Sequence, residues 1–209
     1  MSGISWYPET IAGATERTLR MLGPHVVASG FYLAGGTALA LRFGHRHSVD
    51  LDFFSSVLFD EEALIQQVQT FPEFSLTSKA PHTVHCTIGG TKVSFLGYPY
   101  PTLFPPASFL GVPVADPREI SCMKISAAAS RGTRRDFVDL YFASLQFGMA
   151  EILMWFSQKY AQTNFNRPHI LKALTYFEDA EKDPLPAMFV PLDWAEVKRY
   201  FGKEIQRLA

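Results

Sequence analysis

Two aspartates, Asp50 and Asp52, stand two residues apart in the apolar stretch VDLDFF. Side chains at positions i and i+2 of a strand share one face, so both carboxylates should lie together while Val49, Leu51 and Phe53 point into the core. Neighbouring acids repel unless a cation lies between them. Mg²⁺, or Mn²⁺ in its place, is held by one or two carboxylates together with phosphate oxygens. The pair therefore predicts a divalent metal site, with an exposed strand face as the alternative.

A glycine turn precedes this pair. Gly35 and Gly36 follow an apolar stretch, and Thr37 opens a helical one. Glycine lets a phosphate approach the backbone, and the free N–H groups of a helix start favour an anion. A tight strand-to-helix turn explains the same residues without a ligand. A helix of about eight residues is roughly 12 Å long and returns the chain to an adjacent strand. Turn and acids would then share one cleft, as metal-assisted nucleotidyl transfer requires.

Elements that could position these residues alternate in the first half of the chain. Helices are predicted at 8–23, stopped by Gly23 and Pro24, at 37–44, stopped by Gly44, and at 61–71, capped by Asp60. Strands are predicted at 31–36, 47–55, 74–80, 82–88 and 92–98. The last two strands are joined by GGT, a hairpin signal.

The second half is helical. A proline-rich connector at 98–106 precedes predicted helices at 117–132, 134–147, 149–162, 167–180 and 193–208. Asp116 and Pro117 are a typical helix start. The order predicts an α+β fold, with a small mixed-sheet α/β core at 1–115 and a helical bundle at 116–209 that packs on the core and completes the site.

The composition narrows the class of protein. The chain has 209 residues, 47% hydrophobic and 19% charged, with a net charge of −1. That balance supports a folded core and provides no global basic field for a long nucleic acid.

Cys86 and Cys122 lack metal-type spacing and indicate buried thiols in a reducing cytoplasm. The N-terminus is not expected to be a leader peptide. No run approaches the roughly 20 apolar residues that are needed to cross a bilayer. Walker, G-x-S-x-G and H-E-x-x-H motifs are absent from the sequence.

Two blocks of sequence resemble a known family. LAGGTALALRFGHRHSVDLDFFS, at 33–55, closely resembles the first motif block of the AbiEii-type nucleotidyltransferases, toxins of abortive-infection and toxin–antitoxin systems. They belong to the DNA polymerase β-like superfamily, whose pattern is a Gly-Gly or Gly-Ser turn followed by D-x-D or D-x-E. Thirteen residues separate Gly36 from Asp50, within the spread of that superfamily. EISCMKISAAASRGTRRDFVDLYF, at 119–142, is similar to the family's later block.

The resemblance implies an enzyme that uses Mg²⁺ or Mn²⁺ to move an NMP from an NTP to an acceptor hydroxyl, including that of RNA or a tRNA end. It also implies a cognate antitoxin. Lys124 would contact the phosphates, and either Asp136 or Asp139 would be the family's late aspartate, which binds the base or orders the site. The alternatives are a solvated helix lysine and aspartates in structural ion pairs.

Basic residues near these motifs could bind the nucleotide. Arg46, between the turn and the acids, is the expected phosphate contact. Arg131, Arg134 and Arg135 could pair with the late aspartates or hold a triphosphate or an RNA end.

One position departs from the superfamily. Its catalysts usually supply a third carboxylate from a neighbouring strand as base for the incoming hydroxyl, whereas Ser94 is the inward residue of the corresponding strand. A serine is a poor base. The open alternatives are therefore two-acid catalysis, recruitment of a late aspartate, or a binding module without catalysis. Small-molecule modification, as in antibiotic nucleotidyltransferases, is a further alternative.

Overall fold

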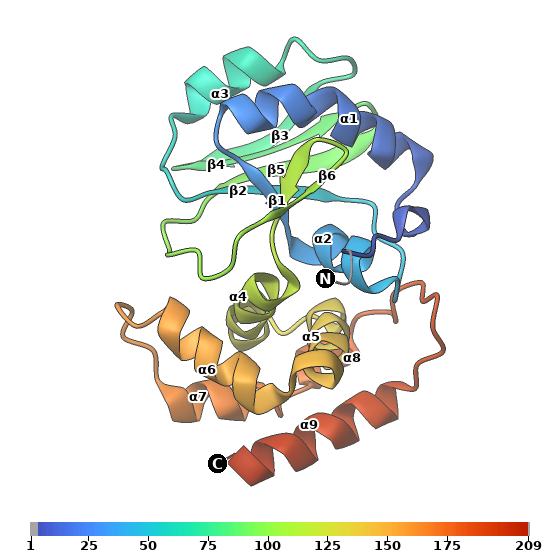
Figure 1. Cartoon of the computed structure of the whole chain (residues 1–209), viewed down its shortest axis with the longest axis vertical. Helices are drawn as coiled ribbons and strands as arrows, with labels where there is room; N and C mark the ends of the chain where they lie inside the picture. The colour runs from blue at the N-terminus through green and yellow to red at the C-terminus, as the bar shows by residue number, and fades with distance from the viewer. Residues whose placement is uncertain (1–3, 209) are drawn as a thin grey trace.

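The computed structural model describes residues 4–208 and places one β-sheet above a group of helices (Figure 1). The sheet is mixed and has the strand order β3-β4-β5-β2-β1-β7-β6. Its strands are β1 (Tyr32–Ala34), β2 (Leu51–Ser55), β3 (Ser75–Ala80), β4 (Thr83–Ile88), β5 (Thr91–Gly97), β6 (Ala107–Phe109) and β7 (Val112–Val114). The predicted α+β class with a small mixed sheet is confirmed.

Helices flank the sheet and fill the second half of the chain. The first half contributes the 3₁₀ turn η1 (Pro8–Thr10), α1 (Gly13–Ala28), α2 (Gly35–Phe43) and α3 (Glu61–Val68). The second half contributes α4 (Pro117–Ser130), α5 (Arg134–Phe147), α6 (Met149–Lys159), α7 (Arg167–Ala173), α8 (Glu178–Glu181) and α9 (Trp194–Leu208). Figure 1 shows α1 and α3 on one side of the sheet, and α4 with the remaining helices on the other.

Strand alternation separates the two faces of the sheet. Phe53 of β2 and Phe95 of β5 are fully buried in the cluster that includes α1 and α3. Asp52 and Ser94 precede these residues, so they point to the opposite face, where they are only partly buried. That second face therefore borders the space between the sheet and α4.

A second apolar cluster joins the helices of the C-terminal half. A buried ion pair between Glu119 of α4 and Lys159 of α6 fixes the proline-rich connector to them. The Glu119 carboxylate accepts the N–H of Leu103 at 2.9 Å, and Lys159 donates to the carbonyl of Pro101 at 2.8 Å. The predicted boundary at residue 115 lies between β7 and α4, and the division into two regions at that point remains a proposal.

The segment between α8 and α9 returns to the first half of the chain. The N–H of His47 donates to the carbonyl of Ala187 at 2.8 Å, and the N–H of Phe189 donates to the carbonyl of His45 at 2.9 Å. The rings of His47 and Phe189 lie 4.0 Å apart between centroids. The C-terminal region therefore contacts the loop that leads to Asp50.

Some expectations about element boundaries were wrong. Helix α1 does not stop at Gly23 and Pro24 but continues to Ala28. The apolar stripe of Leu19, Leu22 and Val26 is fully buried across the proline, and this packing outweighs the one lost backbone hydrogen bond. The single helix predicted at 167–180 is two helices, α7 and α8.

The strand predicted at 47–55 begins only at Leu51. Val49 is 57% exposed and does not point into the core. Ser48 instead forms an isolated bridge with Ile11, so the segment before β2 is held outside the sheet. Asp50 therefore lies in the loop that enters the strand rather than in the strand itself.

Within residues 4–208, no single helix is long and apolar enough to cross a membrane. Helices α5 and α6 meet the length and composition test only as a pair, and they are bent by 108° at their junction.

Candidate active site

Asp50 and Asp52 line one polar cavity of about 190 Å³ between the start of α2, the start of β2 and helices α4 and α5. The Asp50 side chain is 35% exposed, and its Oδ2 lies 3.8 Å from Nη1 of Arg135. In residues 4–208, Asp52 makes no ion pair. The structure therefore brings the two predicted acids together and leaves the more buried one without a cation.

The electrostatics of Asp52 favour a cation. Burial raises the pKa of its carboxyl above the ordinary value of 3.8, and the charge of Asp50 acts in the same direction. A hydrogen bond from Ser94 and the charge of Lys124 oppose the shift without cancelling it. A buried carboxylate with a raised pKa lacks compensating positive charge, which a divalent ion could supply. The donor set fits such an ion through Asp50 and Asp52, with the remaining positions left to phosphate oxygens or water.

The glycine turn fits closely against the acids. Helix α2 begins at Gly35, not Thr37, and no side chain caps its N-terminus. Gly35 has φ +67°, and a Cβ there would lie 2.7 Å from Oδ2 of Asp52. A Cβ on Gly36 would overlap the guanidinium of Arg46. Glycines are therefore required here by Asp52 and Arg46 themselves, and the uncapped N–H groups remain available to an anion.

The hydroxyl of Thr37 positions the acids. It donates to the backbone carbonyl of Asp50 and lies 2.8 Å from the hydroxyl of Ser48. This bond ties the loop before β2 to the first turn of α2. Thr37 can offer a phosphate its backbone N–H, whereas its side chain is already engaged.

Asp139 on α5 is the hub of a buried charge cluster. Its carboxylate accepts two hydrogen bonds from Arg46, from Nε at 2.7 Å and from Nη2 at 2.9 Å. Nζ of Lys124 lies 2.8 Å from Oδ2, and Nε2 of His45 lies 2.8 Å from Oδ1. Burial alone would raise the pKa of Asp139, but Arg46 and Lys124 outweigh it and hold the pKa well below 3.8. Asp139 is therefore an ionised anchor for two cations.

Asp136, one turn earlier on α5, faces the polar cavity. Nζ of Lys124 is 2.9 Å from its Oδ1, and Nε of Arg131 is 3.0 Å from its Oδ2. Burial would raise the pKa of Asp136, but Lys124, Arg131 and a hydrogen bond from Thr133 lower it to about 2. Of the two late aspartates, Asp136 lines the cavity and Asp139 supports it from behind.

Lys124 and Arg46 are not solvated side chains. Lys124 is 6% exposed and Arg46 is 3% exposed, yet both reach the wall of the polar cavity. Burial lowers the pKa of Lys124, but Asp139 and Asp136 reverse this and raise it. Both residues are thus fixed positive charges, with Arg46 held by Asp139 rather than free to reach outward.

The three arginines of the later block separate. Arg131 and Arg135 line the polar cavity. Arg134 turns away, because its Nε donates to the carbonyl of Ala180 at 2.9 Å and its backbone N–H donates to Asp183 at 3.1 Å. The predicted basic group therefore consists of Arg131 and Arg135, while Arg134 ties α5 to α8.

Acid is expected to destabilise the protein through Asp136 and Asp139. Unfolded aspartates bind protons near 3.8, whereas the native carboxyls resist protonation, so the unfolded state binds more protons and stability falls as pH falls. The loss should begin below about pH 5 and continue toward about pH 2. Urea unfolding at pH 6, 4 and 3 measures it. Asp136→Asn should flatten this dependence, and equal slopes for variant and wild type would contradict the assignment.

A second cavity, of about 540 Å³, adjoins the first and shares Gly36, Asp52, Lys124 and Arg131 with it. We call it the sheet-face cavity, because it lies over the open face of β2, β5 and β4. Its apolar lining includes Phe54, Leu96, Tyr98 and Met123, and its polar lining includes His85 and Ser94. His85 lies outside both sequence blocks that predicted the site. The register of β4 against β5 indicates its place in the site, because it sets His85 directly opposite Ser94.

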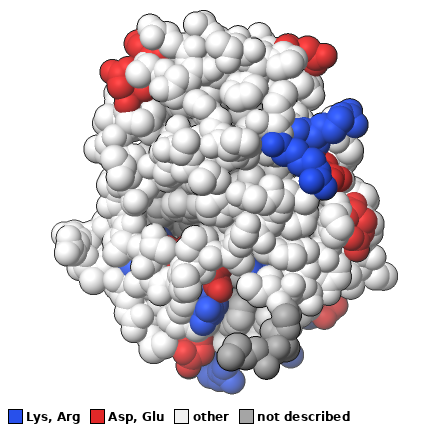
Figure 2. All heavy atoms as spheres, turned by 45° about the horizontal axis from the view of Figure 1, so that its top comes forward, with Lys and Arg blue, Asp and Glu red and all other residues white. Residues whose placement is uncertain are grey.

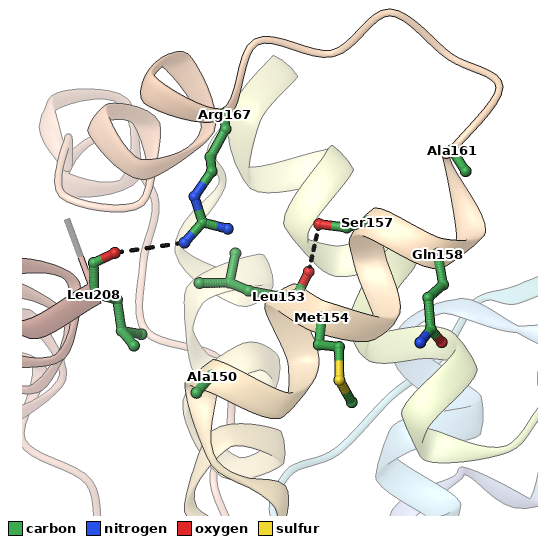
Figure 3. Close-up of a pocket in the computed structure, with 8 residues that line it drawn as sticks. All are labelled: Ala150, Leu153, Met154, Ser157, Gln158, Ala161, Arg167 and Leu208. Carbon is green, nitrogen blue, oxygen red and sulfur yellow. Dashed lines mark hydrogen bonds between the residues drawn. The ribbon is translucent and has the colours of Figure 1, made fainter.

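A larger hollow, of about 570 Å³, lies between α6, α7 and the end of α9 (Figure 3). Its lining is mostly apolar and includes Leu153 and Met154. Arg167, its one charged lining residue among those described, donates to the carbonyl of Leu208 at 3.4 Å. None of the described residues that line this hollow carries a carboxylate, so the polar cavity and the sheet-face cavity are the better candidate active site.

Comparisons with known proteins identify the family of the chain. The profile of the family described as "Nucleotidyl transferase AbiEii toxin, Type IV TA system" matches residues 17–104 and 94–206. An uncharacterized protein of Aquifex aeolicus (strain VF5) is 34% identical over 188 residues, which cover 86% of this chain and 88% of the relative.

Solved structures share the fold at low identity. MenT4, a nucleotidyltransferase toxin from Mycobacterium tuberculosis H37Rv, superposes with a TM-score of 0.61 at 16% identity, covering 92% of this chain and 81% of that one. JHP933 from Helicobacter pylori superposes with a TM-score of 0.57 at 19% identity, covering 98% and 93%. Fold, acid pair and profile match together show that the chain belongs to the AbiEii family of toxin nucleotidyltransferases of type IV toxin–antitoxin systems.

Proposed function

We propose that this nucleotidyltransferase moves an NMP from an NTP to an acceptor hydroxyl and depends on a divalent ion held by Asp50 and Asp52. The observation that carries the proposal is a partly buried, unpaired Asp52 beside the uncapped start of α2. A divalent ion bound there would neutralise phosphate charge and polarise the phosphorus that is attacked.

The protein's own groups would orient the triphosphate. The N–H groups at the start of α2 have no side-chain cap and can donate to phosphate oxygens. Lys124, fixed by Asp136 and Asp139, adds a positive charge at the cavity wall. Arg131 and Arg135 lie at the rim, where their side chains are 64% and 58% exposed. The fixed Lys124 and the exposed Arg131 and Arg135 could together stabilise the negative charge that develops on the phosphate during displacement.

We infer that the acceptor is an RNA end, bound through a local contact. Figure 2 shows one face of the molecule on which Lys and Arg side chains form separate small groups in a mostly uncharged surface. The net charge is −1. Affinity for a long polyanion would be weak under these conditions. A single strand end that enters the cleft past Arg131, which lines both cavities, fits better than a duplex. A cognate antitoxin, as the family implies, would be the protein partner.

Transfer should be abolished by chelation and strongly reduced by Asp50→Asn. We expect labelled NMP to enter total RNA, with release of pyrophosphate, for at least one of four NTPs in Mg²⁺ or Mn²⁺. Asp50→Asn should lower incorporation at least about tenfold, because one metal-binding carboxylate is lost. Its unfolding midpoint should stay unchanged, because the Asp50 side chain is only half-buried, in the loop before β2.

Asp179→Asn is the surface control, since Asp179 only pairs with Lys182 on α8. It should retain wild-type incorporation. The proposal is contradicted if no NTP is incorporated in either metal, or if Asp50→Asn transfers nucleotide as fast as the control.

A further inference from the structure

Ser94 occupies the position from which a third carboxylate would face the acid pair. In the parallel pairing of β2 with β5, Ser94 lies directly beside Asp52. In the antiparallel pairing of β5 with β4, His85 lies directly beside Ser94. Asp52, Ser94 and His85 therefore form one row across three neighbouring strands, on the open face of the sheet.

The hydrogen bonds along this row are directional. Nδ1 of His85 lies 3.1 Å from the Ser94 hydroxyl oxygen, and Ser94 is the strand neighbour of Asp52 on the same face of the sheet. An ionised carboxylate can only accept, so Asp52 favours a Ser94 hydroxyl that turns its single proton toward it. In that arrangement the Ser94 oxygen accepts from His85, which places the imidazole proton on Nδ1. Nε2 is left with a free lone pair.

This lone pair belongs to a residue of the sheet-face cavity. His85, Ser94 and Asp52 all line that cavity, which opens beside the glycine turn through Gly35 and Gly36. His85 is only partly buried. In residues 4–208 its ring makes a protein hydrogen bond through Nδ1 alone. An imidazole with an unengaged Nε2 therefore lines the same cavity as Asp52, two strands away from it.

We propose that Nε2 of His85 accepts the proton of the acceptor hydroxyl, directly or through one water, in place of the missing third carboxylate. The proposal rests on the nucleotidyl transfer proposed above. The hydroxyl oxygen forms a bond to the α-phosphorus, and the bond from that phosphorus to the β-phosphate oxygen breaks. Pyrophosphate leaves with the electron pair of that bond, and the hydroxyl proton ends on His85. Asp52, through Ser94, fixes the ring and stabilises its protonated form.

The assignment also places the acceptor. A hydroxyl that reaches both the α-phosphorus and His85 must enter over the sheet face. There the half-buried rings of Phe54 and Tyr98, 5.5 Å apart between centroids, offer an apolar wall. Stacking on such rings accepts any base. The terminal nucleotide of an RNA would therefore lie in the sheet-face cavity, with the triphosphate in the polar cavity.

Kinetics of His85→Gln tests the role. We expect kcat for NMP transfer to fall by about 10²-fold or more, the usual contribution of a positioned base, with KM for the NTP unchanged. His85→Ala should regain part of its activity with added imidazole, which a merely structural histidine would not allow. His82→Asn, in the turn three residues before His85 and at φ +55°, where asparagine is tolerated, is the matched control and should transfer normally.

Nitrogen NMR of the imidazole tests the tautomer without any turnover. The proton should reside on Nδ1 of His85 in the metal-free protein, and Ser94→Ala should remove that preference. A proton on Nε2, or a His85→Gln variant within threefold of the wild-type kcat, would overturn the proposal. Loss of transfer in the wild type itself would refute the proposed function instead, and the NMR result would still decide whether His85 presents a base.

Discussion

Replacing Asp139 with asparagine is expected to lower the free energy of unfolding by about 3–5 kcal/mol, the usual cost of breaking a buried ion pair from one side. Asp139 is fully buried and neutralises Arg46 and Lys124, both of which are also buried. Asparagine keeps an acceptor but loses the charge, so two cations remain in a poorly solvated interior. Urea unfolding at pH 7 measures the change.

Three variants make this expectation specific. Asp179→Asn removes an exposed carboxylate paired with Lys182 and should change stability by less than about 0.5 kcal/mol. Adding Arg46→Met to Asp139→Asn should recover at least about 1 kcal/mol relative to the sum of the single changes, because the stranded guanidinium is gone. A loss below about 1 kcal/mol for Asp139→Asn, or strict additivity, would show that the cluster is not held by charge.

The acid pair and the glycine turn could be predicted because their signals are local. Asp50 and Asp52 interrupt an apolar stretch, and Gly35 and Gly36 stand between a strand and a helix. The structure does bring turn and acids into one cavity. The sequence indicated glycines for the approach of a phosphate. It did not show that the side chains of Asp52 and Arg46 also leave no room for a Cβ at the turn.

The cluster around Asp139 could not be predicted from spacing. Arg46 and Asp139 are separated by 93 positions, and only the packing of α5 against α2 brings them together. From the sequence, Lys124 reads equally well as a solvated helix lysine, because one polar residue on a helix carries no signal of burial. Asp136 and Asp139 share a helix face, yet their different depths depend on the helices that cover them.

Element boundaries likewise divide into those set by local residues, which could be predicted, and those set by tertiary packing, which could not. Asp60, Asp116 and Thr133 cap their helices through side-chain bonds, as local chemistry dictates. Pro24 failed as a stop because the buried stripe of α1 continues past it. His85 was missed for a related reason. A histidine in an alternating strand looks like a surface residue until the register sets it beside Ser94.

Asp52→Asn is expected to act in opposite directions on stability and activity. Without metal, the change removes a carboxylate whose pKa is raised by burial and by Asp50, so the variant should unfold at a higher temperature than the wild type at pH 7. With metal and NTP, it removes a ligand of the proposed site, and transfer should fall at least about 10³-fold, since metal binding supplies several kcal/mol. Thermal unfolding in chelator, and again with Mg²⁺ and a non-hydrolysable NTP, measures both.

The sign of the stability effect follows from proton binding. The native state binds the Asp52 proton more tightly than the unfolded state, so stability falls as pH rises from 3.8 through the raised native pKa. The advantage of Asp52→Asn should therefore grow over that range and vanish in acid. Asp50→Asn is the matched comparison: it should lose the ligand-dependent stabilisation but gain none in chelator, because Asp50 is only half-buried and already lies 3.8 Å from Arg135. A destabilised Asp52→Asn protein in chelator would mean that this carboxylate supports the fold rather than a cation.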